Sequence, residues 1–310
     1  MGNQIKKCEW QREMPRFWKT LATLAKAIRL HHWLKNLLLF VPLIIAHRIE
    51  ETQLIINAFA GFISFSLCAS SVYLVNDITD LKADKMHPVK RRRPFASGKL
   101  PLYFGFILPP IFLAIATVIA LSLPMTFLQL IAIYLLISLT YSLKLKKIPL
   151  IDVLILAGLY TLRLFAGSVA TGIPISFWLL AFSMFIFLSL AIIKRYSELQ
   201  PIAEKQASAH IPGRGYHIND LATIQVFGIC SGYISILVLA LYINSDQVHA
   251  LYRQPYILWA LCPIFLYWIS YAWMLAGRGE MVEDPLIFAL RDQHSLVVGF
   301  ITLFVIYWAT

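Results

Sequence analysis

Three aspartates at short, regular spacing are the residues of this sequence best suited to chemistry. Asp77, Asp80 and Asp84 follow a long apolar run, and Asn76 directly precedes the first of them. On a helix, intervals of three and four residues place all three carboxylates on one face, where they repel each other unless a cation binds. Mg2+ selects such oxygen ligands and usually shares them with phosphates. We therefore expect Asn76 and the three aspartates to bind Mg2+ and a diphosphate; the alternative is a solvated, acidic helix end.

The composition indicates which kind of element must position these carboxylates. Of the 310 residues, 59% are hydrophobic and only 14% are charged, which is far from the balance of a soluble domain. Several apolar runs approach or exceed the ~20 residues that cross a bilayer. We predict an all-α, polytopic membrane protein with nine transmembrane helices. The predicted spans are residues 33–48, 54–75, 102–122, 126–143, 150–170, 177–193, 221–243, 256–275 and 294–310.

The first 32 residues differ in character from the rest of the chain. They hold basic residues interleaved with Trp10, Phe17 and Trp18, a pattern that suits a helix lying on an anionic membrane surface. We expect residues 1–32 to form this interfacial segment and residues 33–310 to form the transmembrane catalytic domain.

The distribution of charge along this layout predicts the orientation in the membrane. Nearly all of the 27 Lys and Arg residues fall in the N-terminal segment and in alternate loops, and so on one side. The positive-inside rule makes that side the cytoplasm of an inner or plasma membrane, with the C-terminus outside. The carboxylates fall on the same side, which the rule does not require. Both signs of charge are therefore expected together at the cytoplasmic ends of the spans. The net charge of +11 therefore reflects topology, and we expect no nucleic-acid partner.

Further residues near the predicted cytoplasmic ends are candidates to hold phosphate groups. Arg93 and Lys99 flank a turn that contains proline and glycine, and a guanidinium matches phosphate oxygens bidentately. The other candidates for substrate binding are Lys35, Asn36, Asn76, Tyr141, Lys144, Lys146, Lys194, Arg195 and Glu198. For Lys194 and Arg195 the alternative is that the side chains snorkel to the lipid headgroups.

The predicted span 150–170 contains two charged residues, and a charge within a span is costly and indicates function by default. Asp152 lies just inside the span 150–170, and Arg163 lies on the same helical face about three turns further along. We expect Asp152 to be a catalytic residue and Arg163 to bind substrate. A structural ion pair is the alternative for Arg163.

The aspartate pattern and the layout of spans resemble the UbiA-type prenyltransferase superfamily over nearly the whole chain. The acidic stretch reads N-D-x-x-D-x-x-x-D, like the first aspartate motif of that superfamily. The resemblance implies a nine-helix bundle with a polar cavity that opens toward the cytoplasm. Typical members place a D-x-x-x-D motif after the sixth span, for a second Mg2+ on a prenyl diphosphate. Here the same place reads Lys194-Arg195-Tyr196-Ser197-Glu198, which departs from that pattern.

Four segments are similar instead to the decaprenyl-phosphate phosphoribosyltransferase branch of the superfamily. They are His31 to Leu38, Leu162 to Pro174, Lys194 to Leu199 and Glu283 to Pro285. The resemblance implies a Mg2+-dependent enzyme that transfers 5-phosphoribosyl from phosphoribosyl pyrophosphate (PRPP) to a polyprenyl phosphate. Pyrophosphate is released, and the lipid product serves as a precursor for cell-envelope glycans.

The chemistry of the candidate residues fits this implication. A polyprenyl phosphate is already an anion, so the reaction needs no strong general base. Mg2+ held by Asp77, Asp80 and Asp84 can bind the departing pyrophosphate. A carboxylate can stabilise the positive charge that develops on the ribose, and Asp77, Asp84 and Asp152 all remain open for this role.

Two other functions remain open at the level of sequence. An aromatic prenyltransferase with a degenerate second motif would use a prenyl diphosphate as donor. A transporter would place polar residues along the spans. Here the polar residues cluster at the cytoplasmic ends of the predicted spans, with Arg163 as the main exception. The sequence leaves both a monomer and a homo-oligomer open.

Overall fold

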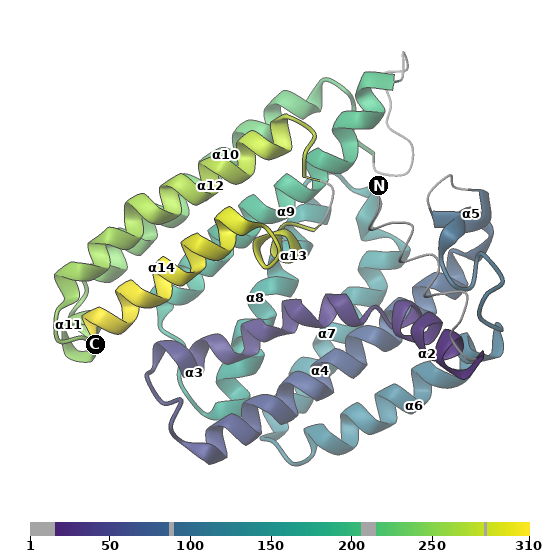
Figure 1. Ribbon diagram of the computed structural model, residues 1–310, viewed down its shortest axis with the longest axis horizontal. Coiled ribbons are helices and arrows are strands. Elements are labelled where there is room, and N and C mark those ends of the chain that lie inside the picture. The colour runs from purple at the N-terminus through teal and green to yellow at the C-terminus, as the bar shows by residue number, and fades with distance from the viewer. Residues whose placement is uncertain (1–15, 87–89, 206–214, 282–283) are drawn as a thin grey trace. The chain divides into compact units, whose positions relative to one another are not determined.

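The structure is helical throughout the part of the chain that it describes. It is a computed structural model that describes residues 16–86, 90–205, 215–281 and 284–310 (Figure 1). These residues form helices joined by turns and contain no β-strand, which confirms the predicted all-α class. Residues 1–15 of the predicted interfacial segment, and Glu283 of the motif at 283–285, lie outside the described residues.

The described helices follow one another along the chain in a simple order. They are α2 (Arg16–Ala27), the 3-10 helix η1 (Leu30–Phe40), α3 (Val41–Ile45), α4 (Thr52–Thr79), α5 (Leu81–Met86), η2 (Lys90–Arg92), α6 (Tyr103–Ala120), α7 (Met125–Leu143), η3 (Leu145–Lys147), α8 (Ile151–Thr171), α9 (Phe177–Lys205), α10 (Asp220–Ile243), α11 (Asp246–Leu251), η4 (Pro255–Ala260), α12 (Leu261–Gly277), α13 (Pro285–Ala289) and α14 (Gln293–Ala309).

The predicted count of nine spans is not confirmed by the described residues. Seven helices are long and apolar enough to cross a bilayer, and a bent pair of helices would make eight if it forms one span. That pair, Thr20–Ala27 and Leu30–Ile45, turns by 51° and covers most of the first predicted span. The last predicted span falls on α14, whose 17 residues reach about 26 Å at 1.5 Å per residue, somewhat short of the ~30 Å hydrocarbon core.

The chain divides into two compact units. The first unit comprises Met1–Asn36 and Phe59–Leu135, and the second unit comprises Leu37–Ala58 and Leu136–Thr310. Because the boundaries fall within η1, α4 and α7, these elements contribute residues to both units.

Serine side chains join α4 to α6 within the first unit. Ser64 Oγ donates to the carbonyl of Ala116 at 2.8 Å, and Ser71 Oγ donates to the carbonyl of Pro109 at 3.1 Å. Both serines are buried. Small hydroxyl residues let two apolar helices approach closely and satisfy the hydroxyl within the protein. This packing holds the far end of α4, which carries the aspartates, against a rigid neighbour.

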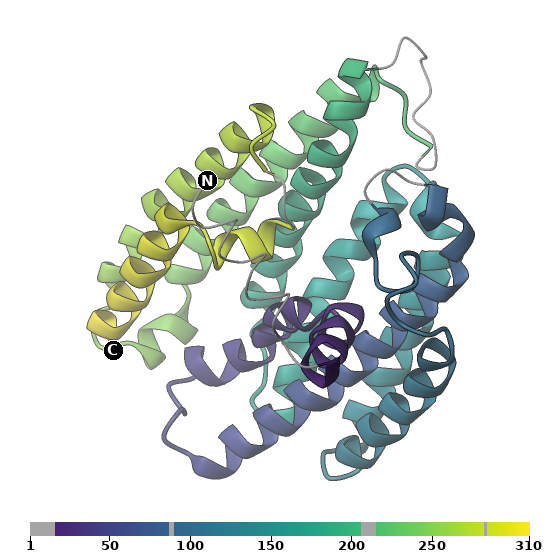
Figure 2. The ribbon, with the colours of Figure 1, turned by 45° about the vertical axis from the view of Figure 1, so that its right-hand side comes forward.

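The second unit is built around α8, α9, α10 and α12, and α9, α10 and α12 run side by side (Figures 1 and 2). A Cβ atom added to Gly228 of α10 would lie 2.1 Å from the ring of Trp273 of α12, so only glycine fits there. The indole of Trp273 donates to Ser189 Oγ at 3.1 Å, and Ser189 Oγ donates to the carbonyl of Gly228 at 2.7 Å. These contacts fix α9, the helix that carries Lys194 and Arg195, relative to its neighbours in the unit.

Two glycines of α8 provide a matched test of this close packing. A Cβ atom on Gly167 would lie 2.1 Å from the backbone oxygen of Leu39, whereas a Cβ atom on Gly158 would meet nothing within 4 Å. We expect Gly167→Ala to destabilise the protein by about 1–3 kcal/mol through overpacking. Gly158→Ala should be neutral or stabilising, because alanine favours a helix by up to about 1 kcal/mol over glycine. Thermal melting in detergent, with size-exclusion chromatography to monitor folded protein, measures the stability of both variants. Equal melting midpoints for the two variants would contradict the packing described.

Candidate functional site

The aspartates of the acidic stretch lie where α4 passes into α5. Asp77 is in the last turn of α4, Asp84 is in α5, and Asp80 lies at the junction between the two helices. The backbone N–H of Asp80 donates to the carbonyl of Asn76 at 2.9 Å, and that of Asp84 donates to Asp80 at 2.8 Å. Helical hydrogen bonding therefore continues across the junction, so the three- and four-residue spacing still brings Asp77 and Asp84 to one side. Their side chains are buried, while those of Asp80 and Asn76 are partly exposed.

Two arginines neutralise these buried carboxylates. Arg93 Nη1 lies 2.6 Å from Asp84 Oδ2 and 3.2 Å from Asp77 Oδ1, and Arg29 Nη2 lies 2.7 Å from the same Asp77 oxygen. The guanidinium carbon of Arg29 also lies 4.7 Å from the centroid of the Tyr73 ring, a cation–π contact. We refer to Arg29, Asp77, Asp84 and Arg93 as the first-unit cluster.

The chemistry of the first-unit cluster fits Mg2+. In the described part of the chain, no three His, Cys, Asp or Glu side chains converge closely enough to enclose a metal ion. Mg2+ does not require such a cage, because it is commonly held by one or two carboxylates and completes its shell with substrate phosphates and water. Asp77 and Asp84 supply two carboxylates that already share one cation. A metal ion at this position would complete its shell with water or with phosphate oxygens from a ligand.

A second group of charges, the second-unit cluster, joins the start of α8 to the C-terminal half of α9. Asp152 Oδ2 lies 2.5 Å from Arg195 Nε, and Asp152 Oδ1 accepts from the Tyr216 hydroxyl at 2.6 Å. The same guanidinium pairs with Glu198 and donates to the Tyr141 hydroxyl at 3.3 Å. Asp152, Arg195 and Tyr216 are each no more than 1% exposed.

The carboxylate of Asp152 is fully engaged by the protein itself. In addition to Arg195 and Tyr216, it accepts a hydrogen bond from the backbone N–H of Val153 at 2.8 Å. A carboxylate that accepts three hydrogen bonds in a buried site is held in one orientation. The geometry thus makes Asp152 an anchor for the guanidinium of Arg195.

Tyr216 belongs to a loop that the sequence analysis did not select. Its hydroxyl accepts a hydrogen bond from the N–H of Leu150 at 2.9 Å, and Leu150 has a left-handed backbone with φ of 63°. Gly215 lies so close to Lys147 that a Cβ atom would be 2.4 Å from the Lys147 carbonyl oxygen. Burial, and then the hydrogen bond to Asp152, raise the pKa of Tyr216. The phenol therefore stays protonated and remains a donor to Asp152.

A third group of polar side chains surrounds Asp284, also in the second unit. Lys194 Nζ lies 3.1 Å from Asp284 Oδ2, and the Tyr160 hydroxyl donates to both Asp284 oxygens at 3.2 and 3.1 Å. Asp284 also caps α13 through the N–H of Leu286. Arg163 is buried on α8, with its guanidinium 5.6 Å from the centroid of the Tyr160 ring. Of the predicted substrate-binding residues, Lys194 thus pairs with Asp284, and Arg163 lies beside the tyrosine that donates to the same carboxylate.

The remaining predicted residues are divided between buried and exposed positions. Lys35 and Asn36 are buried, and Asn36 Nδ2 donates to Ser66 Oγ at 2.8 Å. Lys146 is partly exposed, and Lys99 and Lys144 are exposed. The structure does not place Lys99 or Lys144 within the first-unit, second-unit or Asp284 groups.

Sequence reasoning missed Arg29, Tyr73, Tyr160 and Tyr216. Arg29 is the last basic residue before the first predicted span, so its charge was assigned to membrane orientation. Tyrosines are common in membrane proteins, and nothing in the sequence marks which ones meet a carboxylate. Asp284 was noted only as part of the segment at 283–285.

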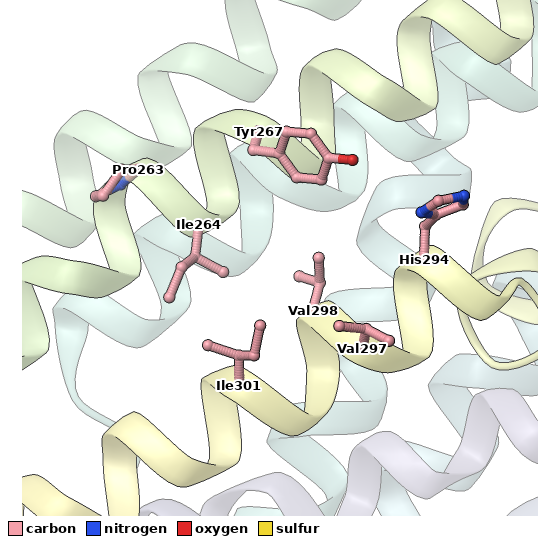
Figure 3. Close-up of a pocket in the computed structure, with 7 residues that line it drawn as sticks. All are labelled: Pro263, Ile264, Tyr267, His294, Val297, Val298 and Ile301. Carbon is pink, nitrogen blue, oxygen red and sulfur yellow. The ribbon is translucent and has the colours of Figure 1, made fainter.

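A groove between α12 and α14 is a separate concave feature of the second unit (Figure 3). It has a volume of about 380 Å³. Its lining is mostly apolar: Pro263, Ile264, Tyr267, His294, Val297, Val298 and Ile301. This lining suits a hydrocarbon chain and offers no carboxylate for a metal.

Comparison with known proteins shows the family to which this chain belongs. The model of the UbiA prenyltransferase family matches residues 37–305. The chain belongs to this family. A solved UbiA homolog from Archaeoglobus fulgidus bound to GPP and Mg2+ has a similar fold, with a TM-score of 0.69 and 16% identity over 93% of this chain and 99% of that one.

Two curated relatives share more than a third of their aligned residues with this chain. The nodulation protein NoeC of Azorhizobium caulinodans is 35% identical over 93% of this chain and 92% of its own length. A decaprenyl-phosphate phosphoribosyltransferase of Corynebacterium glutamicum is 38% identical over 56% of this chain. The chain spans about half the length of some curated relatives, 54% of the Corynebacterium enzyme and 53% of another relative.

The second-unit cluster makes a direct prediction about stability. Tyr216→Phe removes the donor to Asp152 and the acceptor for Leu150 N–H, and we expect a loss of about 1–3 kcal/mol because buried partners are left unpaired. Tyr233→Phe is the control, because that exposed tyrosine hydroxyl bonds to Ser270 Oγ at 3.1 Å and meets no buried carboxylate among the described residues. Thermal melting of the two variants should separate them by several degrees; a Tyr216→Phe midpoint as high as that of Tyr233→Phe would contradict the anchoring described.

Proposed function

We propose that this protein is a Mg2+-dependent phosphoribosyltransferase that transfers 5-phosphoribosyl from PRPP to a polyprenyl phosphate of decaprenyl type. The observation that carries the proposal is the pairing of two cations in the C-terminal half of α9. Lys194 and Arg195 pair there with Asp284 and Asp152, at the place where a second aspartate motif would serve a second metal ion. The similarity to enzymes named decaprenyl-phosphate phosphoribosyltransferases supports the same interpretation.

The reaction requires one bond to break and one to form at the anomeric carbon of the ribose. The bond from this carbon to the pyrophosphate oxygen breaks, and a bond to an oxygen of the polyprenyl phosphate forms. Pyrophosphate leaves with the electron pair of the broken bond. The acceptor oxygen is already anionic, so no protein base has to remove a proton.

The first-unit cluster is proposed to bind the pyrophosphate of the donor. Asp77 and Asp84, with Asp80 and Asn76 nearby in sequence, would hold Mg2+. When bound, the ion offsets the negative charge that builds on the leaving group. Arg93 supplies a guanidinium beside these carboxylates, suited to the phosphate oxygens.

The other cations are proposed to bind the remaining phosphates. PRPP carries a 5-phosphate and the acceptor carries its own phosphate, so a site for both needs more cations than a site for a single diphosphate. Candidates are Lys35, Lys99, Lys144, Lys146, Arg163, Lys194 and Arg195, with Tyr141 and Glu198 beside Arg195. Asp152 is a positioning residue in this scheme, because its oxygens are taken by the protein. Asp77 and Asp84 are better suited to stabilise positive charge on the ribose.

The proposed setting is the cytoplasmic side of an inner or plasma membrane. The N-terminus would lie in the cytoplasm and the C-terminus outside, as the distribution of Lys and Arg predicts. The acceptor would present its phosphate at the membrane boundary with its tail in the bilayer. The product would feed the synthesis of cell-envelope glycans.

A direct assay tests the proposed function. Purified protein is incubated with radiolabelled PRPP, Mg2+ and decaprenyl phosphate, and we expect a labelled lipid with one pyrophosphate released for each lipid formed. Chelation of Mg2+ should stop the reaction. The proposal fails if no labelled lipid forms while a prenyl diphosphate and an aromatic acceptor give product, which would identify an aromatic prenyltransferase.

Asp80 allows a test of the acidic stretch with little risk to folding. It is partly exposed, whereas Asp77 and Asp84 are buried, and removing either one would take a carboxylate away from its arginine. We expect Asp80→Ala to lower turnover at least about 100-fold, as loss of one electrostatic group in a reaction site does, without loss of folded protein in size-exclusion chromatography. Asp246→Ala, in the first turn of α11, is the control for loss of a carboxylate. Near-normal turnover of Asp80→Ala would show that Asp80 takes no part in metal binding.

A further inference from the structure

A single nitrogen atom of Arg93 lies between the two buried carboxylates of the first-unit cluster. Arg93 Nη1 is 2.6 Å from Asp84 Oδ2 and 3.2 Å from Asp77 Oδ1. A cation shared by these two oxygens would need the same space. A metal ion that binds both carboxylates and the observed position of Arg93 are therefore mutually exclusive.

The charges of the cluster lead to the same conclusion. Asp77 and Asp84 carry two negative charges, and Arg29 and Arg93 carry two positive charges, so the cluster is neutral as it stands. A divalent ion added alone would leave an excess of positive charge in a largely buried place, which is unfavourable. A divalent ion that arrives with pyrophosphate brings its own compensating negative charge, and that charge needs a cationic partner.

The backbone around Arg93 is fixed while its side chain is accessible. The N–H of Arg93 donates to the carbonyl of Lys90 at 2.9 Å, and its carbonyl accepts from the N–H of Ser97 at 2.9 Å. Phe95 and Leu100 pack into a small core of the first unit. The Arg93 side chain is 27% exposed, whereas those of Asp77 and Asp84 are 3% and 4% exposed. The guanidinium can therefore change partner by side-chain rotation alone.

We propose that Arg93 is an exchangeable counter-ion. It neutralises Asp77 and Asp84 when no ligand is bound, and it moves to the phosphate oxygens when a divalent metal–diphosphate complex takes its place between the carboxylates. Arg29 keeps its partner, because it contacts only Asp77 of the pair and its guanidinium also lies over the Tyr73 ring. This inference rests on the proposed function, since it assumes that the cluster binds a metal with a diphosphate.

The exchange gives Arg93 opposite effects on two ligands. Arg93 competes with a metal ion that binds alone, so its removal should strengthen metal binding. Arg93 contacts the diphosphate in the complex, so its removal should weaken diphosphate binding. A residue that only maintained the structure of the cluster would weaken both.

The test uses Mn2+ as the metal and inorganic pyrophosphate as the diphosphate, with the full-length protein in uncharged detergent micelles. Free Mn2+ is measured by electron paramagnetic resonance, and labelled pyrophosphate is measured at saturating Mn2+. For Arg93→Gln we expect Mn2+ alone to bind at least about threefold more tightly and pyrophosphate at least about threefold more weakly than to the unmodified protein. Arg92→Gln removes the same charge at an exposed neighbouring position and should change neither affinity by more than about twofold.

Arg93→Lys is the substitute variant for the binding test if Arg93→Gln does not fold. A lysine keeps the charge but lacks the fork that reaches two acceptors, so both affinities should shift in the same directions by smaller factors. Weaker binding of both ligands to the Arg93 variants, with Arg92→Gln unchanged, would overturn the exchange and leave the proposed metal site standing. Failure of the unmodified protein to bind Mn2+ with pyrophosphate would overturn both the exchange and the metal site of the proposed function.

Discussion

A carboxylate buried inside a protein must have a positive partner, and this requirement organises the polar parts of the molecule. Leaving one member of a buried ion pair alone costs roughly 3–5 kcal/mol, a large share of the stability of a typical domain. Asp77, Asp84 and Asp152 are all buried, and each lies within 3.2 Å of a guanidinium nitrogen. The helices of each unit are held so that these partners meet.

The two clusters meet the requirement in different ways. In the second unit, Asp152 and Arg195 are both almost completely buried, and Tyr216 and Val153 complete the hydrogen bonds of the carboxylate. In the first unit, the carboxylates are buried but the arginines are 20% and 27% exposed. The second-unit arrangement fixes a guanidinium in place, and the first-unit arrangement allows a partner to leave. This difference is why we assign positioning to Asp152 and ligand exchange to Arg93.

The local features of the site could be predicted from the sequence. Asp77 and Asp84 share one side because helical spacing continues through the junction at Asp80, and the apolar runs predict most of the long helices. The first span was less well predicted, because hydropathy does not reveal the bend before η1. The last predicted span coincides with α14, which is a short helix of 17 residues. The membrane orientation and the roles of individual site residues stay predictions.

The long-range partners could not be read from the sequence. Arg29 and Asp77 are 48 positions apart, and Tyr216 and Asp152 are 64 positions apart. Periodicity within one helix carries no information about such pairs. Asp152 is an example: as a lone acid inside a span it predicts catalysis, whereas its three donors make it an anchor in the structure.

The central claim is that Asp77 and Asp84 receive a metal–diphosphate complex in the place that Arg93 now fills. An experimental structure with Mn2+ and pyrophosphate, solved with anomalous scattering from the metal, tests it most directly. We predict a metal peak in contact with oxygens of Asp77 and Asp84, with the Arg93 guanidinium turned away from them and bound to pyrophosphate. A metal peak elsewhere, with Arg93 still between the two aspartates, would contradict it.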